Sequence, residues 1–205
     1  MRLHRTAALA AAIVLGACNA GDDPTVEAGG DTATTGGTAV ATSTSTPPTT
    51  GAVAPPVSAP APAGAERAYL TDVRVAAAEV GGGSRVVFEF EPNLPAYRID
   101  YIERPITEDG SGNEVAVAGE AVLEVRFDDA SGARIEGEKV ILTYKGPKRV
   151  PATGAGGVVT EAVDTGDFEG IVTWAVGLRK KTPTITVTTL AGPDRLVIDV
   201  PAPTT

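Results

Sequence analysis

Residues 85–91 read Arg85-Val86-Val87-Phe88-Glu89-Phe90-Glu91, and they alternate between apolar and charged side chains. Val86, Phe88 and Phe90 share one face of an extended chain, whereas the charged side chains share the other. Because successive side chains of a strand point to opposite faces, this pattern predicts a strand with one buried and one solvated face.

Similar runs recur along the chain from residue 66. Alternation is found at 69–75, 97–101, 123–127, 140–145, 185–189 and 196–200, while residues 171–178 are more uniformly apolar. Turn-forming clusters rich in Gly, Pro, Asp and Ser separate these runs, at 81–83, 109–112, 131–132, 154–157 and 192–194. No long segment shows the helical period. We therefore predict an all-β fold, a β-sandwich of about eight or nine mostly antiparallel strands over residues 66–203.

The stretch that precedes this domain has a different composition. Residues 19–64 contain seven Pro and seven Gly in a background of Thr, Ser and Ala, and their large apolar residues are scattered valines. Such a segment cannot bury enough surface to offset the entropy lost on ordering. We predict a disordered linker over residues 18–65.

The N-terminus has the features of an export signal. Two arginines lie within residues 1–5, and the nine apolar residues 7–15 are too few to span a bilayer, which takes about 20. This pattern is typical of a signal peptide, here residues 1–17. The sequence Leu15-Gly16-Ala17-Cys18 resembles the bacterial lipobox, which implies cleavage before Cys18 and acylation of its thiol. We expect an exported protein whose partner is the membrane, with the lipid on Cys18 inserted in the outer face of the cytoplasmic membrane. The alternative is a Cys18 buried in an apolar N-terminal helix.

Composition excludes several functions. The chain has 17 basic and 26 acidic residues, which argues against a nucleic-acid partner. Its one Cys, at 18, and its one His, at 4, leave the mature domain without the residues for a disulfide, a Cys/His zinc site or a histidine-based catalytic triad. Nothing selects a pair of catalytic carboxylates. We expect no enzyme, no catalytic residues, no metal and no cofactor.

One loop has two possible interpretations, a polar hairpin and a calcium site. Asp109, Ser111, Asn113 and Glu114 lie in a Gly-rich stretch and carry oxygen atoms that suit Ca²⁺. Their spacing departs from the EF-hand loop, which requires a Gly and a Glu further along. We expect a polar hairpin loop, with a calcium site as the alternative.

Two basic clusters interrupt the acidic background of the domain, which has 22 acidic and 15 basic residues from Glu66 onward. Each cluster lies at a turn next to a predicted strand. We expect them to form one ligand-binding patch at one end of the sandwich, which contacts carboxylates or phosphates of cell-wall polymers. The alternative is two solvated loops. The residues are Lys145, Lys148, Arg149, Arg179, Lys180 and Lys181.

The few aromatic residues fall on the faces that we assign to the core. We therefore expect them to pack inside the domain rather than to stack on sugar rings. The residues are Phe88, Phe90, Tyr97, Tyr101 and Trp174.

Several segments also resemble a known family, in the same order along the chain. They are residues 70–75, 85–90, 97–101, 144–149, 167–178 and 193–200, of which Asp167-Phe168-Glu169-Gly170 with the following Trp174 is the most specific. Together they resemble the AMIN-like domain of actinobacterial lipoproteins, which is distantly similar to the AMIN domain of cell-wall amidases and pilus secretins. The resemblance implies a small, non-catalytic β-sandwich that binds cell-wall material, either peptidoglycan glycan or its attached peptides. The alternative is a protein-interaction scaffold that recruits or regulates an envelope or secretion machine.

Overall fold

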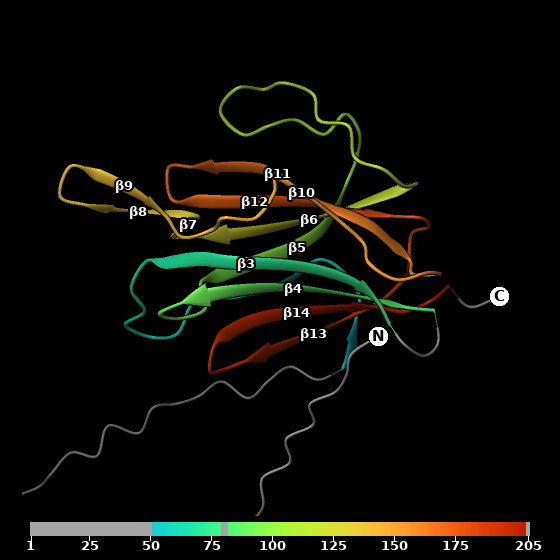
Figure 1. The fold of residues 1–205 in the computed structure, drawn as a ribbon. Coiled ribbons are helices and arrows are strands. Elements are labelled where there is room, and N and C mark those ends of the chain that lie inside the picture. The colour runs from blue at the N-terminus through green and yellow to red at the C-terminus, as the bar shows by residue number, and fades with distance from the viewer. Residues whose placement is uncertain (1–50, 79–81, 204–205) are drawn as a thin grey trace, which may run out of the picture. The chain divides into compact units, whose positions relative to one another are not determined.

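The computed structural model describes residues 51–78 and 82–203. The expected signal peptide, Cys18 and the linker up to residue 50 lie outside the described residues. Within the described ranges the chain forms strands and no helix, and hence no helix that is long and apolar enough to cross a membrane. Two sheets pack face to face (Figure 1). The prediction of an all-β sandwich is confirmed.

The first sheet contains both ends of the described chain. Its strands are antiparallel except for β3 and β7, which are parallel. The order is β1 (Ala52–Val53), β13 (Ile185–Leu190), β14 (Asp194–Val200), β4 (Ser84–Glu91), β3 (Ala68–Ala77) and β7 (Ala130–Ser131).

The second sheet is antiparallel throughout. Its order is β10 (Arg149–Pro151), β11 (Val159–Phe168), β12 (Ile171–Leu178), β6 (Ala121–Asp128), β5 (Ala96–Ile102) and β2 (Val57–Ala59). A separate hairpin of β8 (Ala133–Glu136) and β9 (Lys139–Leu142) projects from one end of the sandwich (Figure 1).

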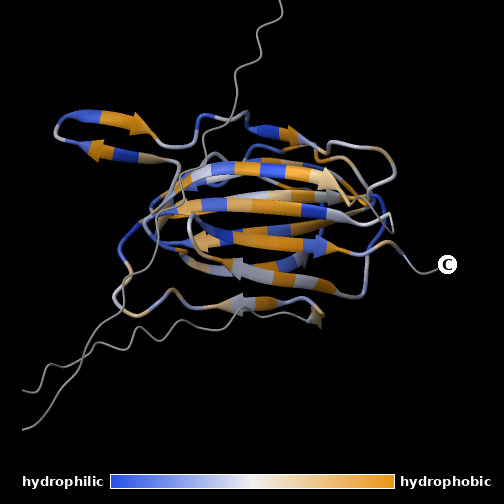
Figure 2. Ribbon diagram, turned by 60° about the horizontal axis from the view of Figure 1, so that its bottom comes forward, coloured by the Kyte–Doolittle hydropathy of each residue, from blue (hydrophilic) through white to orange (hydrophobic). Residues whose placement is uncertain are grey.

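The core lies between the two sheets. Figure 2 shows hydrophobic and hydrophilic positions alternating along their strands. Trp174 on β12 is 1% exposed, and its ring centroid lies 5.9 Å from that of Phe88 on the facing sheet. Phe88 in turn meets Phe127 at 5.1 Å in an edge-to-face contact. Phe88, Phe90, Tyr97 and Trp174 are buried as expected. Tyr101 is only half-buried, because it lies at the end of β5.

The sandwich has more strands than the sequence predicts, and the largest omission is the ten-residue strand β11. Its pairing with β12 shifts register twice, between Val159 and Glu161 and between Asp164 and Gly166. Each bulge inserts an extra residue and reverses the faces of the residues that follow. The apolar residues of β11 therefore do not alternate along the sequence.

Part of the expected linker is ordered against the sandwich. Residues 51–65 carry β1, which pairs with β13, and β2, which pairs with β5. Val53, Val57 and Ala59 pack against the core from these strands. A few valines are enough to order this segment, because the sheet edges supply backbone hydrogen-bond partners that an isolated segment lacks.

The long connection from β5 to β6, residues 103–120, covers the outer face of the second sheet. It contributes Ile106 and Val117 to a second apolar cluster with Val163 and Ala175. A Cβ at position 177 would lie 2.0 Å from the Ala118 carbonyl oxygen, so only glycine lets the connection approach β12 this closely. Strand β12 is therefore buried on both faces, which explains its uniformly apolar sequence.

The Gly-rich stretch within this connection forms a hairpin. The Glu108 backbone N–H donates to the Asn113 carbonyl at 2.8 Å, and the Thr173 hydroxyl donates to Asp109 Oδ2 at 2.7 Å. The Asp109 carboxylate thus fixes the hairpin to β12. This arrangement is the polar hairpin that we expected from the sequence.

Candidate functional site

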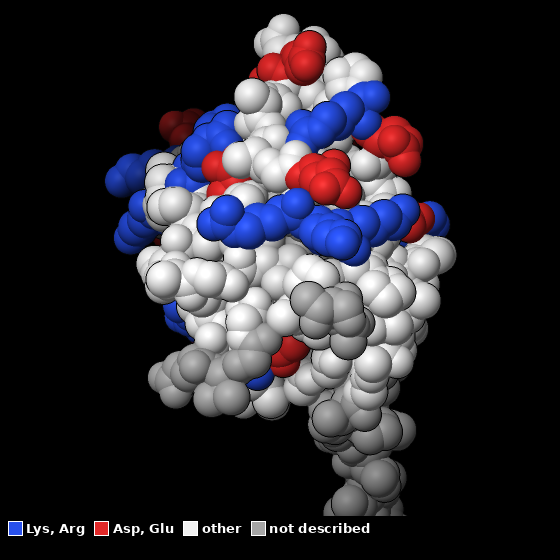
Figure 3. All heavy atoms as spheres, turned by 90° about the vertical axis from the view of Figure 1, so that its right-hand side faces the viewer, with Lys and Arg blue, Asp and Glu red and all other residues white. Residues whose placement is uncertain are grey.

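One end of the sandwich gathers most of the predicted site residues. Strands β5, β12 and β14 finish at this end, and β6 and β11 begin there. Figure 3 views this end and shows a belt of Lys and Arg side chains with acidic side chains among them. We call this surface the basic end. Its cations include Arg104, Arg149, Arg179, Lys180 and Lys181.

Arg149 has a structural role at the basic end. Its guanidinium donates to the Ala116 carbonyl at 2.7 Å and forms an ion pair with Glu161. The Glu161 side chain is only 9% exposed and also accepts the Ala118 backbone N–H at 2.7 Å. Removing the arginine would leave a buried carboxylate without its cation, which is costly. Arg149 therefore fastens the 103–120 connection to the sheet.

The second cluster follows β12 directly. The Arg179 backbone N–H donates to the Val158 carbonyl, and its Nε donates to the Gly157 carbonyl at 2.9 Å. Lys180 and Lys181 are exposed. The Lys181 ammonium lies 4.5 Å from the ring centroid of Tyr101, which is a cation–π contact.

Lys145 and Lys148 lie along the edge of the second sheet rather than within the second cluster. The Lys148 carbonyl accepts the Asp164 backbone N–H in the middle of β11. Lys145 lies near the far end of β11. The N–H of the preceding residue, Tyr144, donates to the Gly132 carbonyl, and the Gly132 N–H donates to Asp167 of β11. The structure thus brings Arg149 close to the second cluster and leaves both lysines along the edge.

Tyr144 holds the turn that carries Lys145. Burial, and secondarily the nearby Asp72 and Asp164 carboxylates, raise the pKa of Tyr144 to about 12. The hydroxyl therefore stays protonated at neutral pH and donates to the Pro147 carbonyl at 2.9 Å. Burial also raises the pKa of Asp164, against the lowering effect of Lys148.

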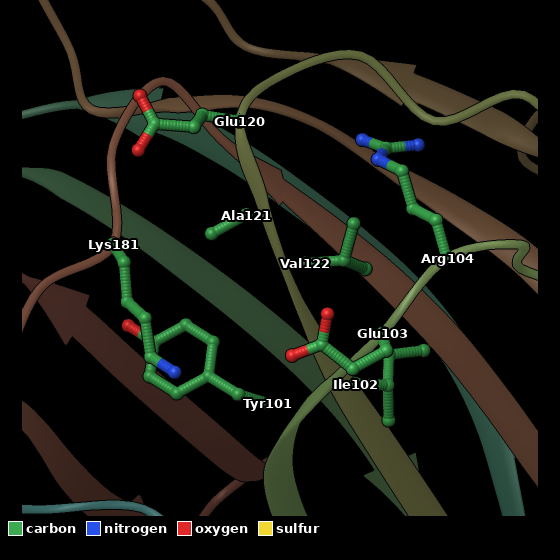
Figure 4. A pocket seen from close by; sticks show the side chains of 8 residues that line it. All are labelled: Tyr101, Ile102, Glu103, Arg104, Glu120, Ala121, Val122 and Lys181. Atoms are coloured by element: carbon green, nitrogen blue, oxygen red, sulfur yellow. The ribbon is translucent and has the colours of Figure 1, made fainter.

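A depression at the basic end adjoins the Tyr101–Lys181 contact. It has a volume of about 270 Å³, and a second, more open hollow of about 570 Å³ shares Tyr101 and Lys181 with it. Ala121 and Val122 contribute apolar groups to its lining, and the tyrosine ring lies at one side (Figure 4). Glu103 points toward the centre, while Arg104 and Glu120 rise at opposite sides (Figure 4).

The tyrosine and the lysine are fixed by the chain around them. The Tyr101 hydroxyl donates to the Thr182 carbonyl at 2.8 Å and accepts the Thr182 N–H at 3.1 Å. Thr182 itself is buried, so it locks the Lys181 backbone against β5. Arg104 donates to the carbonyls of Val117 and Gly119, at 2.7 and 2.9 Å. The depression is therefore preorganised on short, anchored segments.

This arrangement suits a ligand that carries both charge and an apolar or ring face. The two cations, Arg104 and Lys181, can bind carboxylates, and Glu103 and Glu120 can accept hydrogen bonds from amines or hydroxyls. The Tyr101 ring offers a flat surface for a sugar or a peptide group.

Sequence reasoning placed Lys181 at the site but missed Tyr101, Glu103, Arg104 and Glu120. A signal was present, because Glu103 and Arg104 come within three residues after one predicted strand, 97–101, and Glu120 lies three residues before the next, 123–127. Consecutive antiparallel strands bring such residues to the same end of a sheet.

Comparison with known proteins agrees with the resemblance found in the sequence. The family model described as the AMIN-like domain matches residues 68–202, from the first residue of β3 to just beyond β14. No curated protein and no solved structure gives a significant match. The match covers more than half of the chain and includes the strands that build the basic end, so the protein belongs to the AMIN-like domain family.

Proposed function

We propose that this protein is exported, is anchored to the outer face of the cytoplasmic membrane by a lipid on Cys18, and binds peptidoglycan through the basic end of its AMIN-like domain. Membership of the family supports a non-catalytic binding domain that is associated with the cell wall and envelope. The observation that carries the ligand site is the depression beside Tyr101 and Lys181. It is the place where an aromatic face and charged groups converge.

Charge favours the same surface. From Glu66 onward the domain has an excess of seven acidic residues, so random contact with an anionic wall is repulsive. Cations concentrated at one end overcome this repulsion locally. Because single exposed ion pairs contribute at most about 1 kcal/mol and are screened by salt, binding should be multivalent and salt-sensitive.

Purified sacculi should remove the full-length chain, solubilised in detergent, from solution. We expect most of the protein in the pellet at low salt and a progressive loss as salt is raised. Soluble peptidoglycan fragments should compete, because they present the same glycan and peptide groups. The measurement is the fraction of protein that sediments with the sacculi.

The same experiment separates wall binding from the alternative, a scaffold for an envelope or secretion machine. A scaffold would stay in the supernatant at every salt concentration. Sedimentation that soluble fragments do not reduce would also contradict the proposal, since it would reflect non-specific adsorption.

Cys18→Ser should abolish membrane anchoring. A serine hydroxyl cannot form the thioether that links the lipid, so the variant should accumulate as an uncleaved precursor or a released protein. Metabolic labelling with palmitate and partition into detergent measure this directly. Labelling of the Cys18→Ser chain equal to that of the natural chain would contradict the lipid assignment.

A further inference from the structure

The end opposite the basic end carries the exposed large apolar side chains of the described residues. Phe168 lies at the β11–β12 turn and Leu190 at the β13–β14 turn. The other three lie in the projecting hairpin, where Ile135 is 77% exposed, Val140 68% and Leu142 59%. Single exposed apolar residues are common, but a contiguous exposed apolar patch, such as the hairpin carries, often marks a surface that binds a protein or a membrane.

The three hairpin residues share one face. Ile135 pairs with Val140, and Leu142 pairs with Ala133, so these four side chains point to the same side of the two-stranded sheet. This side, which we call the apolar hairpin face, contains no polar side chain. Figures 1 and 2 show the hairpin standing away from both sheets.

The opposite face of the hairpin turns toward the domain. Its Arg134 lies 3.5 Å from Glu91 on β4 and 2.7 Å from Glu136. The base is also fixed, because the N–H groups of Thr143 and Tyr144 donate to the Gly132 carbonyl. The Gly132 N–H donates to Asp167 at 2.7 Å. These contacts hold the apolar hairpin face outward.

The charges of the hairpin do not oppose contact with a lipid surface. Two cations, Arg134 and Lys139, balance two carboxylates, Glu136 and Glu138, within residues 133–142. The hairpin is thus neutral on a domain that is otherwise acidic. Binding of an amphipathic element at a membrane interface scales with the apolar area that it buries, and a neutral hairpin adds no charge repulsion from anionic headgroups.

The length of chain before the described residues allows this orientation. Between Cys18 and Gly51 there are 32 residues, which reach at most roughly 110 Å when fully extended. The described chain begins with β1 beside Ile185, at the basic end, and a ten-residue strand is about 33 Å long. The anchor point can therefore lie beneath the hairpin while the basic end faces away from the membrane.

We infer that the apolar hairpin face lies in the interfacial layer of the membrane to which Cys18 is anchored. This inference rests on the proposed lipid anchor and adds a second contact that orients the domain. Insertion is shallow, since β8 and β9 pair only with each other among the described strands and their outer backbone groups must stay hydrated. The domain then presents its basic end to the cell wall.

Depth-dependent quenching tests the inference. The lipidated full-length chain carrying Ile135→Trp is reconstituted into vesicles of phosphatidylethanolamine and phosphatidylglycerol with brominated acyl chains. We expect quenching of the added tryptophan several-fold greater than that of a matched tryptophan at the opposite end, Lys180→Trp. The buried Trp174 is common to both variants and gives the baseline.

A second pair of variants separates insertion from accidental proximity. Adding Val140→Glu to Ile135→Trp places a charge on the apolar hairpin face and should abolish the quenching, whereas Lys139→Gln on the other face should leave it unchanged. All these positions are exposed, so the fold is retained.

Each remaining outcome has one meaning. Protein that sediments with the vesicles but shows equal quenching at positions 135 and 180 overturns the inference and leaves the lipid anchor intact. Protein that does not sediment with the vesicles overturns both. A blue shift at position 135 that depends on protein concentration and not on brominated lipid also overturns it, and identifies the face as a contact surface for a second copy of the chain.

Discussion

Trp174→Ala should lower the free energy of unfolding by about 3–5 kcal/mol, the usual cost of deleting a large buried aromatic side chain. The indole is 1% exposed and meets Phe88 of the facing sheet and Tyr144, at 5.9 and 5.6 Å between ring centroids. Its Nε1 has no hydrogen-bond partner within the described part of the chain, so the loss consists of packing and of the cavity left behind. Such a loss is a large share of the stability of a domain of this size. Urea and thermal unfolding measure it.

Phe168→Ala is the matched control. Phe168 is also aromatic and lies near β12, but it is 54% exposed. We expect its replacement to change the stability by no more than about 0.5 kcal/mol. If Trp174→Ala unfolds at the natural melting temperature and instead fails to bind sacculi, the tryptophan is a ligand platform and our account of the core is wrong.

The sequence predicts the strands whose side chains alternate without interruption. Residues 85–91, 97–101 and 196–200 each have one face in the core and form β4, β5 and β14. The same reasoning does not predict β11, because the two bulges of this strand change which of its residues face inward. A pattern of period two contains no information on where a strand bulges.

Two further features depend on tertiary context. The segments at 52–53 and 57–59 become strands only because the edges of the two sheets lie beside them. Residues 140–145 alternate like a core strand, yet Val140 and Leu142 are exposed on a hairpin that leaves the sandwich. Alternation identifies a strand, but it does not identify what covers the apolar face.

The candidate site is predicted in part. Charge clustering in the sequence finds Lys180 and Lys181 at the basic end, but it cannot separate a cation that is free to bind a ligand from one that a carboxylate already holds. Arg149 belongs to the second kind, because the buried Glu161 lies against it. The sequence also does not show the role of Tyr101. Its alternation predicts a core residue, but Tyr101 lies at the end of β5, where part of its ring lines a depression.

Only cations that are free to bind a ligand are suitable for testing the binding surface. Arg149 and Arg179 are tied to backbone carbonyls or to Glu161, so their replacement would perturb the fold as well as the charge. Lys148, Lys180 and Lys181 are exposed and form no ion pair with a carboxylate among the described residues. Replacing these three lysines with serine should therefore change the stability little and reduce wall binding strongly. Lys145 is left in place, because it follows the hairpin base near the far end of β11.

A charge-matched variant controls for the change in net charge. Arg67, Lys139 and Arg195 lie at or near the opposite end, and replacing them with serine removes the same number of cations. The ion pair of Arg67 with Asp129 is exposed and contributes little to stability. We expect this control to bind sacculi nearly as well as the natural chain.

The most direct test of the account is the retention of these two variants on purified sacculi at low salt, with the melting temperature of each measured in parallel. We predict that the variant lacking Lys148, Lys180 and Lys181 melts close to the natural temperature and stays in the supernatant, while the charge-matched control sediments. Equal retention of the two variants would contradict the assignment of wall binding to these lysines at the basic end and along the adjoining edge of the second sheet.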